Sequence, residues 1–430
     1  MKKIILPILL LIIVVSVGCD NLLEDYVEFI TPHETEPYVR PPDDPIIITI
    51  TDADEFKELL LQLIMEHEAT TTINYYSYDG ENVQDILNEI AINLKSEDPI
   101  GAYAVADIQI NATRIVAYFE VDIEIEFKRS KEQIDSIVNV GTSRYMTTQI
   151  QQIMSQHNDE AIIRTRMGLT KESIIELITD IYYQNPRSIV MLPFVTVEMF
   201  PEEGIDRIYE IKFIYIESAD MMQLFAENLA LYVRRNAERA VGDTDAEILL
   251  SLVENLMAST SFDIGAASAI SVHGAQNFAA TAFGALVQGN AVGEGFAMAF
   301  KALCDELGFN SIVVLGGLND LVHAWNIIYL EGDYYHIDVS MCVENGLEIA
   351  FLKTDADFEE MGYTWDRENT VRCEGELTLD DIIIPEDPEN PENPDNPQDP
   401  NNPEIPDNPE NNGTNDDQTN NISEENGDEG

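Results

Sequence analysis

One segment in the first third of the chain constrains the fold more than any other. Between residues 120 and 127, apolar side chains alternate strictly with acidic ones. Successive side chains of a strand point to opposite faces, so this alternation predicts an antiparallel strand that is half-buried. Apolar residues at helical spacing precede it over 83–95, Pro99 is expected to end that helix, and another strand is expected over 103–111. Together these segments predict a unit of mixed helix and strand.

The same pattern returns about 86 residues later, which indicates an internal duplication. A helix is expected over 173–183, with strands over 189–200 and 208–215. Two copies are too few for a solenoid. Residues 46–238 are therefore expected to form one α+β accessory region with two weak repeats. No catalytic residue types gather there, and the isolated His67 and His157 are expected at its surface.

The charge of the chain narrows the choice of partners. Among 430 residues there are 80 Asp and Glu against 23 Lys and Arg, a formal net charge of -57. Such a chain repels phosphates, which excludes nucleic acid and an anionic lipid surface as electrostatic partners. Cationic partners or loosely held divalent ions remain open, as does a plainly solvated acidic surface. A calcium-dependent adhesin would explain the acidity, but the sequence has no EF-hand loop pattern.

The two ends differ in composition from the rest. Two lysines, a short apolar run and a small-residue exit predict a signal peptide over 1–18, and the Gly18-Cys19 exit resembles the bacterial lipoprotein lipobox. That resemblance implies lipidation of Cys19 and anchoring on the extracellular face of the bacterial cell membrane, the only membrane contact we expect. An ordinary cleaved signal or an uncleaved anchor remains the alternative. Residues 19–45 read as an acidic, proline-containing linker, and 384–430 as a disordered acidic tail rich in Pro and Asn.

The chemistry is expected in residues 239–375. A small-residue stretch over 280–297 runs into an apolar helix that ends near Gly308. A strand His323-Ala324-Trp325-Asn326 follows, and a hairpin partner ends in His336-Ile337-Asp338-Val339. This order resembles the bacterial transglutaminase-like family, which has a papain-like fold. The resemblance covers roughly residues 240–368, so the whole chain is expected to be α+β with this domain at its C-terminal side.

The resemblance implies a catalytic triad and also shows that one member is missing. In that family a Cys thiolate attacks an amide, a His acts as base and an Asp orients the His. His323 and Asp338 take the second and third positions, whereas Gly293 stands where the Cys is expected. Glycine has no side chain and cannot be a nucleophile. The flanking Glu294, with Phe296 and Trp325, is expected to line a binding groove.

Other residues do not easily replace the missing thiol. Cys304 lies 11 positions after residue 293, about three turns or roughly 16 Å along the same helix. Cys342 follows the strand that carries the Asp, and Tyr363 stands where the family has a His. A disulfide between Cys342 and Cys373 is allowed outside the cell, although the sequence leaves the pairing open. His273 shows no partner, and His336 is expected to be a structural residue of a strand.

Two functions of different classes follow. The first is a surface lipoprotein whose transglutaminase-like domain has lost its nucleophile and serves in binding or scaffolding at the cell envelope. The alternative is an active, thiol-independent or atypical transglutaminase or amidase acting on peptide or glutamine amides. In either case we expect no cofactor and no metal ion, and a peptide, protein or cell-wall ligand that the sequence does not identify.

Overall fold

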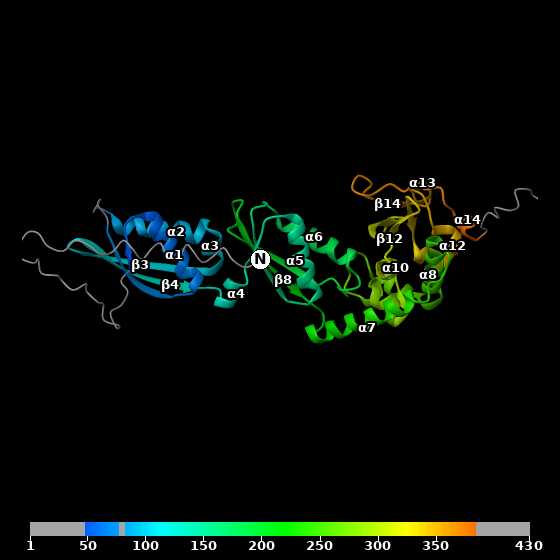
Figure 1. Ribbon diagram of the computed structural model, residues 1–430, viewed down its shortest axis with the longest axis horizontal. Helices are drawn as coiled ribbons and strands as arrows, with labels where there is room; N and C mark the ends of the chain where they lie inside the picture. The colour runs from blue at the N-terminus through cyan, green and yellow to red at the C-terminus, as the bar shows by residue number, and fades with distance from the viewer. Residues whose placement is uncertain (1–47, 77–81, 384–430) are drawn as a thin grey trace, which may run out of the picture.

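Helices and strands alternate throughout residues 48–76 and 82–383, the part of the chain that the structure, a computed structural model, describes. They form three units in a row along the long axis of the molecule (Figure 1). We refer to residues 48–130, 131–216 and 217–383 as the first, second and third unit. The predicted signal peptide, Cys19, the linker and the acidic tail lie outside the described residues. Among the described helices, none combines the length and the apolar character that a membrane crossing requires.

The first unit packs helices on one face of a four-stranded sheet. Its strands lie in the order β1-β2-β4-β3, and β1 is parallel to β2 while the other pairs are antiparallel. The predicted alternation is confirmed in β4, where Val121, Ile123 and Ile125 are buried and the four acids from Glu120 to Glu126 are exposed. The elements are β1 (Ile48–Ile50), α1 (Ala53–Glu66), β2 (Thr70–Tyr75), α2 (Val83–Glu97), α3 (Pro99–Ala104), β3 (Val105–Ile115) and β4 (Tyr118–Phe127).

Pro99 does not simply end a helix, as the sequence suggests. Helix α2 ends at Glu97, and Asp98 then caps a new helix, α3, by accepting from two backbone N–H groups. Pro99 occupies the first position of α3, where a missing N–H and a fixed φ are tolerated. The following strand therefore starts at Val105, two residues later than predicted.

The second unit repeats this topology with the strand order β5-β6-β8-β7. The outer face of its sheet carries buried Ile162 and Ile208, which belong to the same core as Tyr103 of the first unit and Ile134 of α4. The first unit thus packs its helical end on the second sheet. The elements are α4 (Lys131–Asp135), β5 (Val138–Val140), α5 (Ser143–Ser155), β6 (Glu160–Thr165), α6 (Lys171–Gln184), β7 (Phe194–Phe200) and β8 (Arg207–Ile214).

The two histidines expected at the surface of the accessory region are not free there. His157 is only 3% exposed, and its ring meets that of Tyr215. His67 is half-buried, stacks on Phe127 and bonds through Nε2 to the carbonyl of Arg129. Both have a left-handed backbone at or just after a helix end, which turns their rings back towards the unit. The polar context of their neighbours gave no sign of this burial.

The third unit is built around helix α10 (Gly293–Leu307), which is buried at every position from Gly293 to Cys304. A sheet in the order β13-β12-β11-β14 packs on it, and α7 (Ala219–Ala237) and α8 (Asp245–Ser259) also contact it. This unit shares one continuous core with the second. Its other elements are β9 (Ser261–Phe262), α9 (Ile264–Ala269), η1 (Phe278–Ala280), η2 (Gly284–Gln288), β10 (Asn290–Ala291), β11 (Ser311–Leu318), β12 (Leu321–Leu330), β13 (Asp333–Ile337), α11 (Val339–Asn345), α12 (Leu347–Ala350), α13 (Asp355–Glu360), β14 (Tyr363–Trp365) and α14 (Leu379–Ile383).

The cysteines of this unit form no disulfide. Cys304, Cys342 and Cys373 are all free and buried. The bridge between Cys342 and Cys373 that the sequence allows is therefore not made.

Candidate functional site

The first residue of α10 and a histidine of β12 lie against each other. Helix α10 begins at Gly293, after Val292 in an extended conformation, and the helix start is buried. A Cβ placed on Gly293 would lie 2.6 Å from Cε1 and 2.8 Å from Nδ1 of His323, and 3.4 Å from Oγ of Ser340. Real Cβ atoms do not approach other groups this closely, so the imidazole takes up the space that a side chain at position 293 would need.

His323 is held from its other side by Asp338. The distance from His323 Nε2 to Asp338 Oδ2 is 2.5 Å. Strands β12 and β13 are antiparallel neighbours, and Asp338 follows β13 directly as the N-cap of α11. Nδ1 of His323 therefore faces Gly293, and Nε2 faces the carboxylate. The structure brings together the three residues that the sequence placed at the triad positions.

Asp338 has more partners than an orienting carboxylate needs. It is buried, and Oδ2 also accepts from the hydroxyl of Tyr363 at 2.7 Å, while Oδ1 accepts from Ser340 Oγ at 2.6 Å and from the backbone N–H of Met341 at 3.1 Å. Tyr363, which stands where the resembled family has a His, is thus a second support for the carboxylate. Its pKa is raised by burial and by the Asp338 charge, so it stays a neutral donor.

The His323–Asp338 pair favours its charged form. Burial opposes the charge on both groups, but the attraction between them is stronger. The pKa of His323 is raised above its ordinary value despite desolvation, because Asp338 lies beside it. The pKa of Asp338 is lowered despite desolvation, through His323 first and through the hydroxyl donors. The arrangement favours an imidazolium paired with a carboxylate, with no acid or thiol of the described chain opposite Nδ1.

Glu294, expected to line a groove, is instead held inside the molecule. It is 6% exposed, and Oε1 accepts from the hydroxyl of Tyr183 in α6 at 2.7 Å and from the backbone N–H of Gly274 at 3.1 Å. His273 lies 3.9 Å from Oε2 through Nδ1, and its Nε2 lies 3.1 Å from the carbonyl oxygen of Gly316. The second unit therefore reaches the residue next to Gly293, a contact that the sequence did not reveal.

Trp325 and Phe296 do not line a groove either. Both are fully buried, so neither presents a surface to a ligand. The Trp325 indole N–H donates to Nδ1 of His336 at 2.9 Å. The aromatic pattern of the strand is explained by packing in the core, and the expectation that these residues contact a ligand does not fit this structure.

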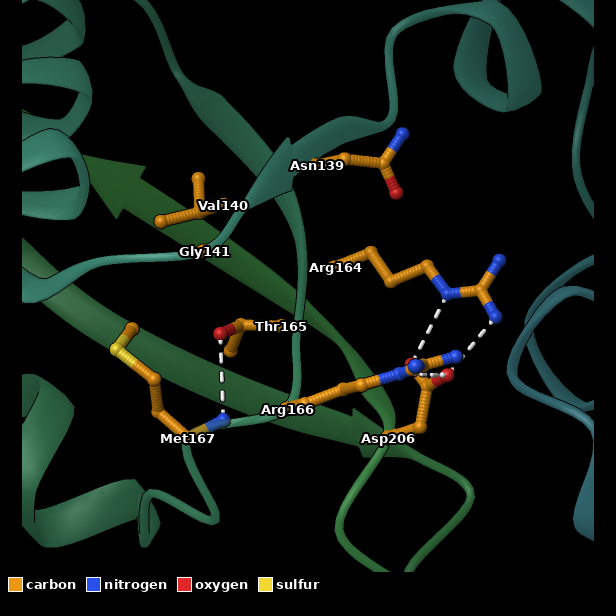
Figure 2. A pocket seen from close by; sticks show the side chains of 8 residues that line it. All are labelled: Asn139, Val140, Gly141, Arg164, Thr165, Arg166, Met167 and Asp206. Atoms are coloured by element: carbon orange, nitrogen blue, oxygen red, sulfur yellow. Dashed lines mark hydrogen bonds and ion pairs between the residues drawn. The ribbon is translucent and has the colours of Figure 1, made fainter.

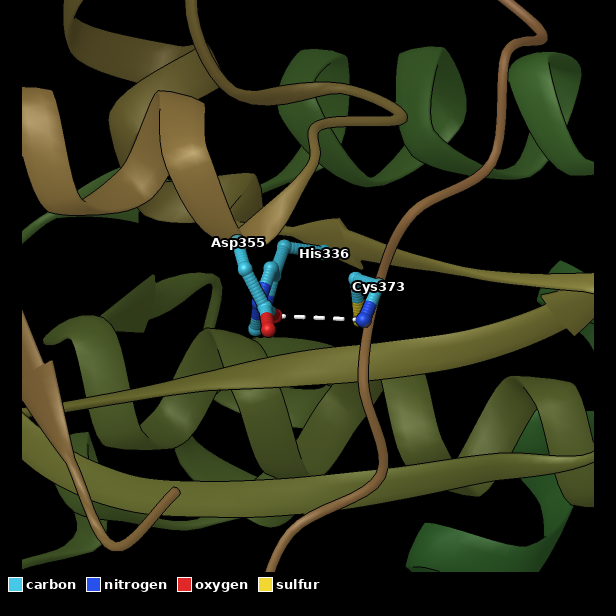
Figure 3. A group of neighbouring side chains, drawn as sticks. All are labelled: His336, Asp355 and Cys373. Carbon is cyan, nitrogen blue, oxygen red and sulfur yellow. Dashed lines mark hydrogen bonds and ion pairs between the residues drawn. The ribbon is translucent and has the colours of Figure 1, made fainter.

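A second group of buried side chains resembles a metal site but is built as a hydrogen-bonded chain. Donor atoms of His336, Asp355 and Cys373 lie within 4.8 Å of one another (Figure 3). The indole donor occupies the Nδ1 lone pair of His336, so the ring proton sits on Nε2, which lies 2.9 Å from Asp355 Oδ1. A ligating imidazole needs a free lone pair at the nitrogen facing the metal. Arg367 pairs with the other oxygen of Asp355. This donor set does not fit a metal ion, and it supports the structural role predicted for His336.

The remaining thiols are poor substitutes for a nucleophile. Burial raises the pKa of Cys342 to about 12, with a further contribution from Asp338, and burial also raises the pKa of Cys304 strongly. A thiol acts as a nucleophile only as a thiolate, which both environments disfavour. Neither residue takes part in the hydrogen bonds around His323.

Comparison with known proteins adds distant likenesses only. No family model matches the chain, and no curated protein matches it. Among solved structures, a transglutaminase overlaps 59% of this chain and 68% of its own, with a TM-score of 0.25 and 10% identity. A protein provisionally assigned as a cysteine protease, from Cytophaga hutchinsonii, overlaps 34% of this chain and 62% of its own, with a TM-score of 0.21 and 14% identity. These scores decide nothing about activity.

Proposed function

We propose that the protein is a non-catalytic binding or scaffolding protein of the bacterial cell envelope, with a transglutaminase-like third unit that lacks its nucleophile. The observation that carries the proposal is the contact between Gly293 and His323. Papain-like catalysis needs a thiol within hydrogen-bond reach of the imidazole, and here the imidazole itself fills that space.

The network behind the imidazole supports a binding role over a collapsed site. His323, Asp338, Tyr363 and Ser340 form a connected set in which each carboxylate oxygen has two donors. Asp338, Tyr363 and Ser340 are buried and restrict the rotamer of His323, whose side chain is 14% exposed and is thus held ready to recognise a polar ligand. A peptide, a protein segment or a cell-wall fragment is the expected ligand class.

The proposal is tested first by chemistry. The full chain should release no ammonia from a glutamine-containing peptide, and thiol alkylation should not change its binding properties. In the Gly293→Cys variant the ring of His323 has to move aside for the new Cβ. The thiol should then lie beside the imidazolium and alkylate faster near neutral pH than Cys304, because the neighbouring charge favours the thiolate. Ammonia release by the unmutated protein that disappears in His323→Ala would show an active enzyme and reject the proposal.

Binding is tested by soaking crystals of the full chain with muropeptides and with a glutamine-containing peptide. Ligand density within hydrogen-bond distance of His323 is expected. Density only at other surfaces, together with unchanged affinity in His323→Ala, would show that the third unit does not bind through this site.

Anchoring at the envelope is a separate part of the proposal. It depends on Cys19 and the apolar segment before it. In cell fractionation, the Cys19→Ala variant should move from the membrane to the soluble fraction. Equal solubility of the two proteins in the medium would reject the lipoprotein assignment.

A further inference from the structure

A cleft far from His323 gathers basic side chains that the proposed function does not use. It has a volume of about 550 Å³ and lies at the ends of β5 and β6 in the second unit. Figure 2 shows Asn139, Arg164 and Arg166 directing their side chains to the same side, with Asp206 below them. A second cleft of about 370 Å³ shares Asn139 and Arg164 and has an apolar wall from the first unit and the segment that follows it. That wall contains Leu61, Met65, Ile100, Ile134 and Ile137.

The basic groups are only partly neutralised. Arg164 donates to Asp206 through Nε and Nη2, both at 3.0 Å, and Arg166 donates through Nε at 2.9 Å. Two guanidinium groups thus share the carboxylate of Asp206, which balances one of their two positive charges. Both Nη groups of Arg166 lack a partner among the residues that the structure describes, and the side chain is 80% exposed.

Two further acids border the adjoining cleft, and both are already engaged. Asp98 accepts from the backbone N–H groups at the start of α3, at 2.9 and 3.3 Å. Asp135 is paired with Lys131 one helical turn away. Asp98 keeps its negative charge, which acts on Arg164 and, after the larger effect of Asp206, helps to raise its pKa. Within the part of the chain that the structure describes, neither acid is hydrogen-bonded to the Nη groups of Arg166.

The duplication provides an internal comparison for these residues. Thr49 pairs with Asn74 in the first unit, and Asn139 pairs with Arg164 at the same place in the second. Asn139 therefore corresponds to Thr49, and Arg164 corresponds to Asn74. Arg166 and Asp206 correspond in the same way to two tyrosines, Tyr76 and Tyr118, whose ring centroids are 5.4 Å apart. The topology therefore does not require charge at these positions. The charged set occurs only in the copy that borders a cleft between units.

We propose that this cleft binds a carboxylate carried on an apolar body. The planar fork of Arg166, with the free Nη1 of Arg164, is suited to a planar carboxylate. Asp206 and Asp98 already balance much of the basic charge, so the free N–H groups of the two arginines suit a monoanion better than a phosphate dianion. The apolar wall beside Arg164 covers the rest of the ligand, and clefts at domain boundaries are common ligand sites.

The probes are N-acetyl-leucyl-leucine and its C-terminal amide, with octanoate as an aliphatic acid, titrated into the full chain by calorimetry. The acid should bind about tenfold more tightly than the amide, and Arg166→Gln should remove most of that difference. Arg166 is exposed, so this variant should fold normally. The matched control is Arg187→Gln, which removes an exposed arginine paired with Glu306 outside the cleft.

The outcomes separate the alternatives. Stronger binding of the dipeptide acid identifies a peptide C-terminus as the ligand, and stronger binding of octanoate identifies an aliphatic acid. Equal affinity for acid and amide, no saturable binding of any probe, or the same loss in the Arg187→Gln control would overturn the proposal. None of these results depends on whether His323 binds a ligand.

Discussion

Alanine at position 293 tests the packing around His323 most directly. In a helix, Gly→Ala normally gains up to about 1 kcal/mol. Here the new Cβ would lie 2.6 Å from Cε1 of His323, whereas ordinary contact begins at 3.4 Å, so the ring must retreat by 3.4 − 2.6 = 0.8 Å. The ring is held by Asp338, and overpacking of this kind costs about 1–3 kcal/mol. We therefore expect Gly293→Ala to lower the free energy of unfolding by up to about 2 kcal/mol, the difference between these two effects.

The measurement uses urea unfolding followed by tryptophan fluorescence. The chain has two tryptophans, Trp325 and Trp365, and both lie in the third unit, so the signal reports on that unit. The control is Gly265→Ala in α9, where the nearest contact of a new Cβ is 3.4 Å from a side-chain oxygen. It should be neutral or slightly stabilising.

A double-mutant cycle identifies the clash as the cause. In the His323→Ala background, Gly293→Ala should lose its cost and become neutral or stabilising, with a coupling energy of about 1–3 kcal/mol. A stabilising Gly293→Ala in the wild-type background would refute the reasoning, since it would mean that the imidazole does not occupy this space. An equal cost in both backgrounds would place the strain elsewhere.

Three further results are expected. The pKa of His323 is raised, so the charged pair contributes fully to stability below about pH 6.5 and its contribution is lost as the pH rises through the raised value. His323→Gln should therefore lower the free energy of unfolding more at pH 6 than at pH 9. The same loss at both pH values in urea unfolding would argue against a charged pair. Trp325→Phe should destabilise by at least about 1–3 kcal/mol by circular dichroism, because it leaves a buried nitrogen of His336 without its donor, and a neutral result would contradict the assigned ring proton. Tyr183→Phe should lower the free energy of unfolding by about 1.5–3 kcal/mol, because the hydrogen bond to the buried Glu294 carboxylate is lost. The loss should be clearly smaller in a Glu294→Gln background. Equal losses in the two backgrounds would show that the hydroxyl does not act through Glu294.

Local sequence patterns were enough to predict the elements whose burial follows from the spacing of neighbouring residues. The alternation in β4 identifies its buried face because a strand has a period of two. The order of the segments around residue 293, His323 and Asp338 also predicted that these residues meet. His323 and Asp338 meet because a short hairpin between β12 and β13 fixes the register of their strands. Residue 293 reaches them because α10 packs on β12.

Contacts between distant segments were not predictable in the same way. Tyr183 and Glu294 are 111 positions apart, and each reads as an ordinary helix residue. The burial of Trp325 and His157 was missed for a related reason. Periodicity indicates which side of an element is covered, but not which other segment covers it or how completely. Helix ends with a left-handed residue, as at His157, also turn a side chain away from the face that the helical spacing gives it.

Asp338 and His323 have different roles: Asp338 supports the fold, whereas His323 is the residue at which a function of the site is to be sought. Asp338 caps α11 and accepts from Tyr363 and Ser340 independently of the imidazole, so its loss would disturb the fold whatever the site does. His323 has Asp338 as its side-chain partner, and its Nδ1, which faces Gly293, has no hydrogen-bond acceptor among the described residues. Buried ion pairs are weak sources of stability, because desolvation offsets most of their attraction. Stability alone therefore gives little reason for a charged imidazole at this position, and a ligand that accepts from Nδ1 gives a direct one.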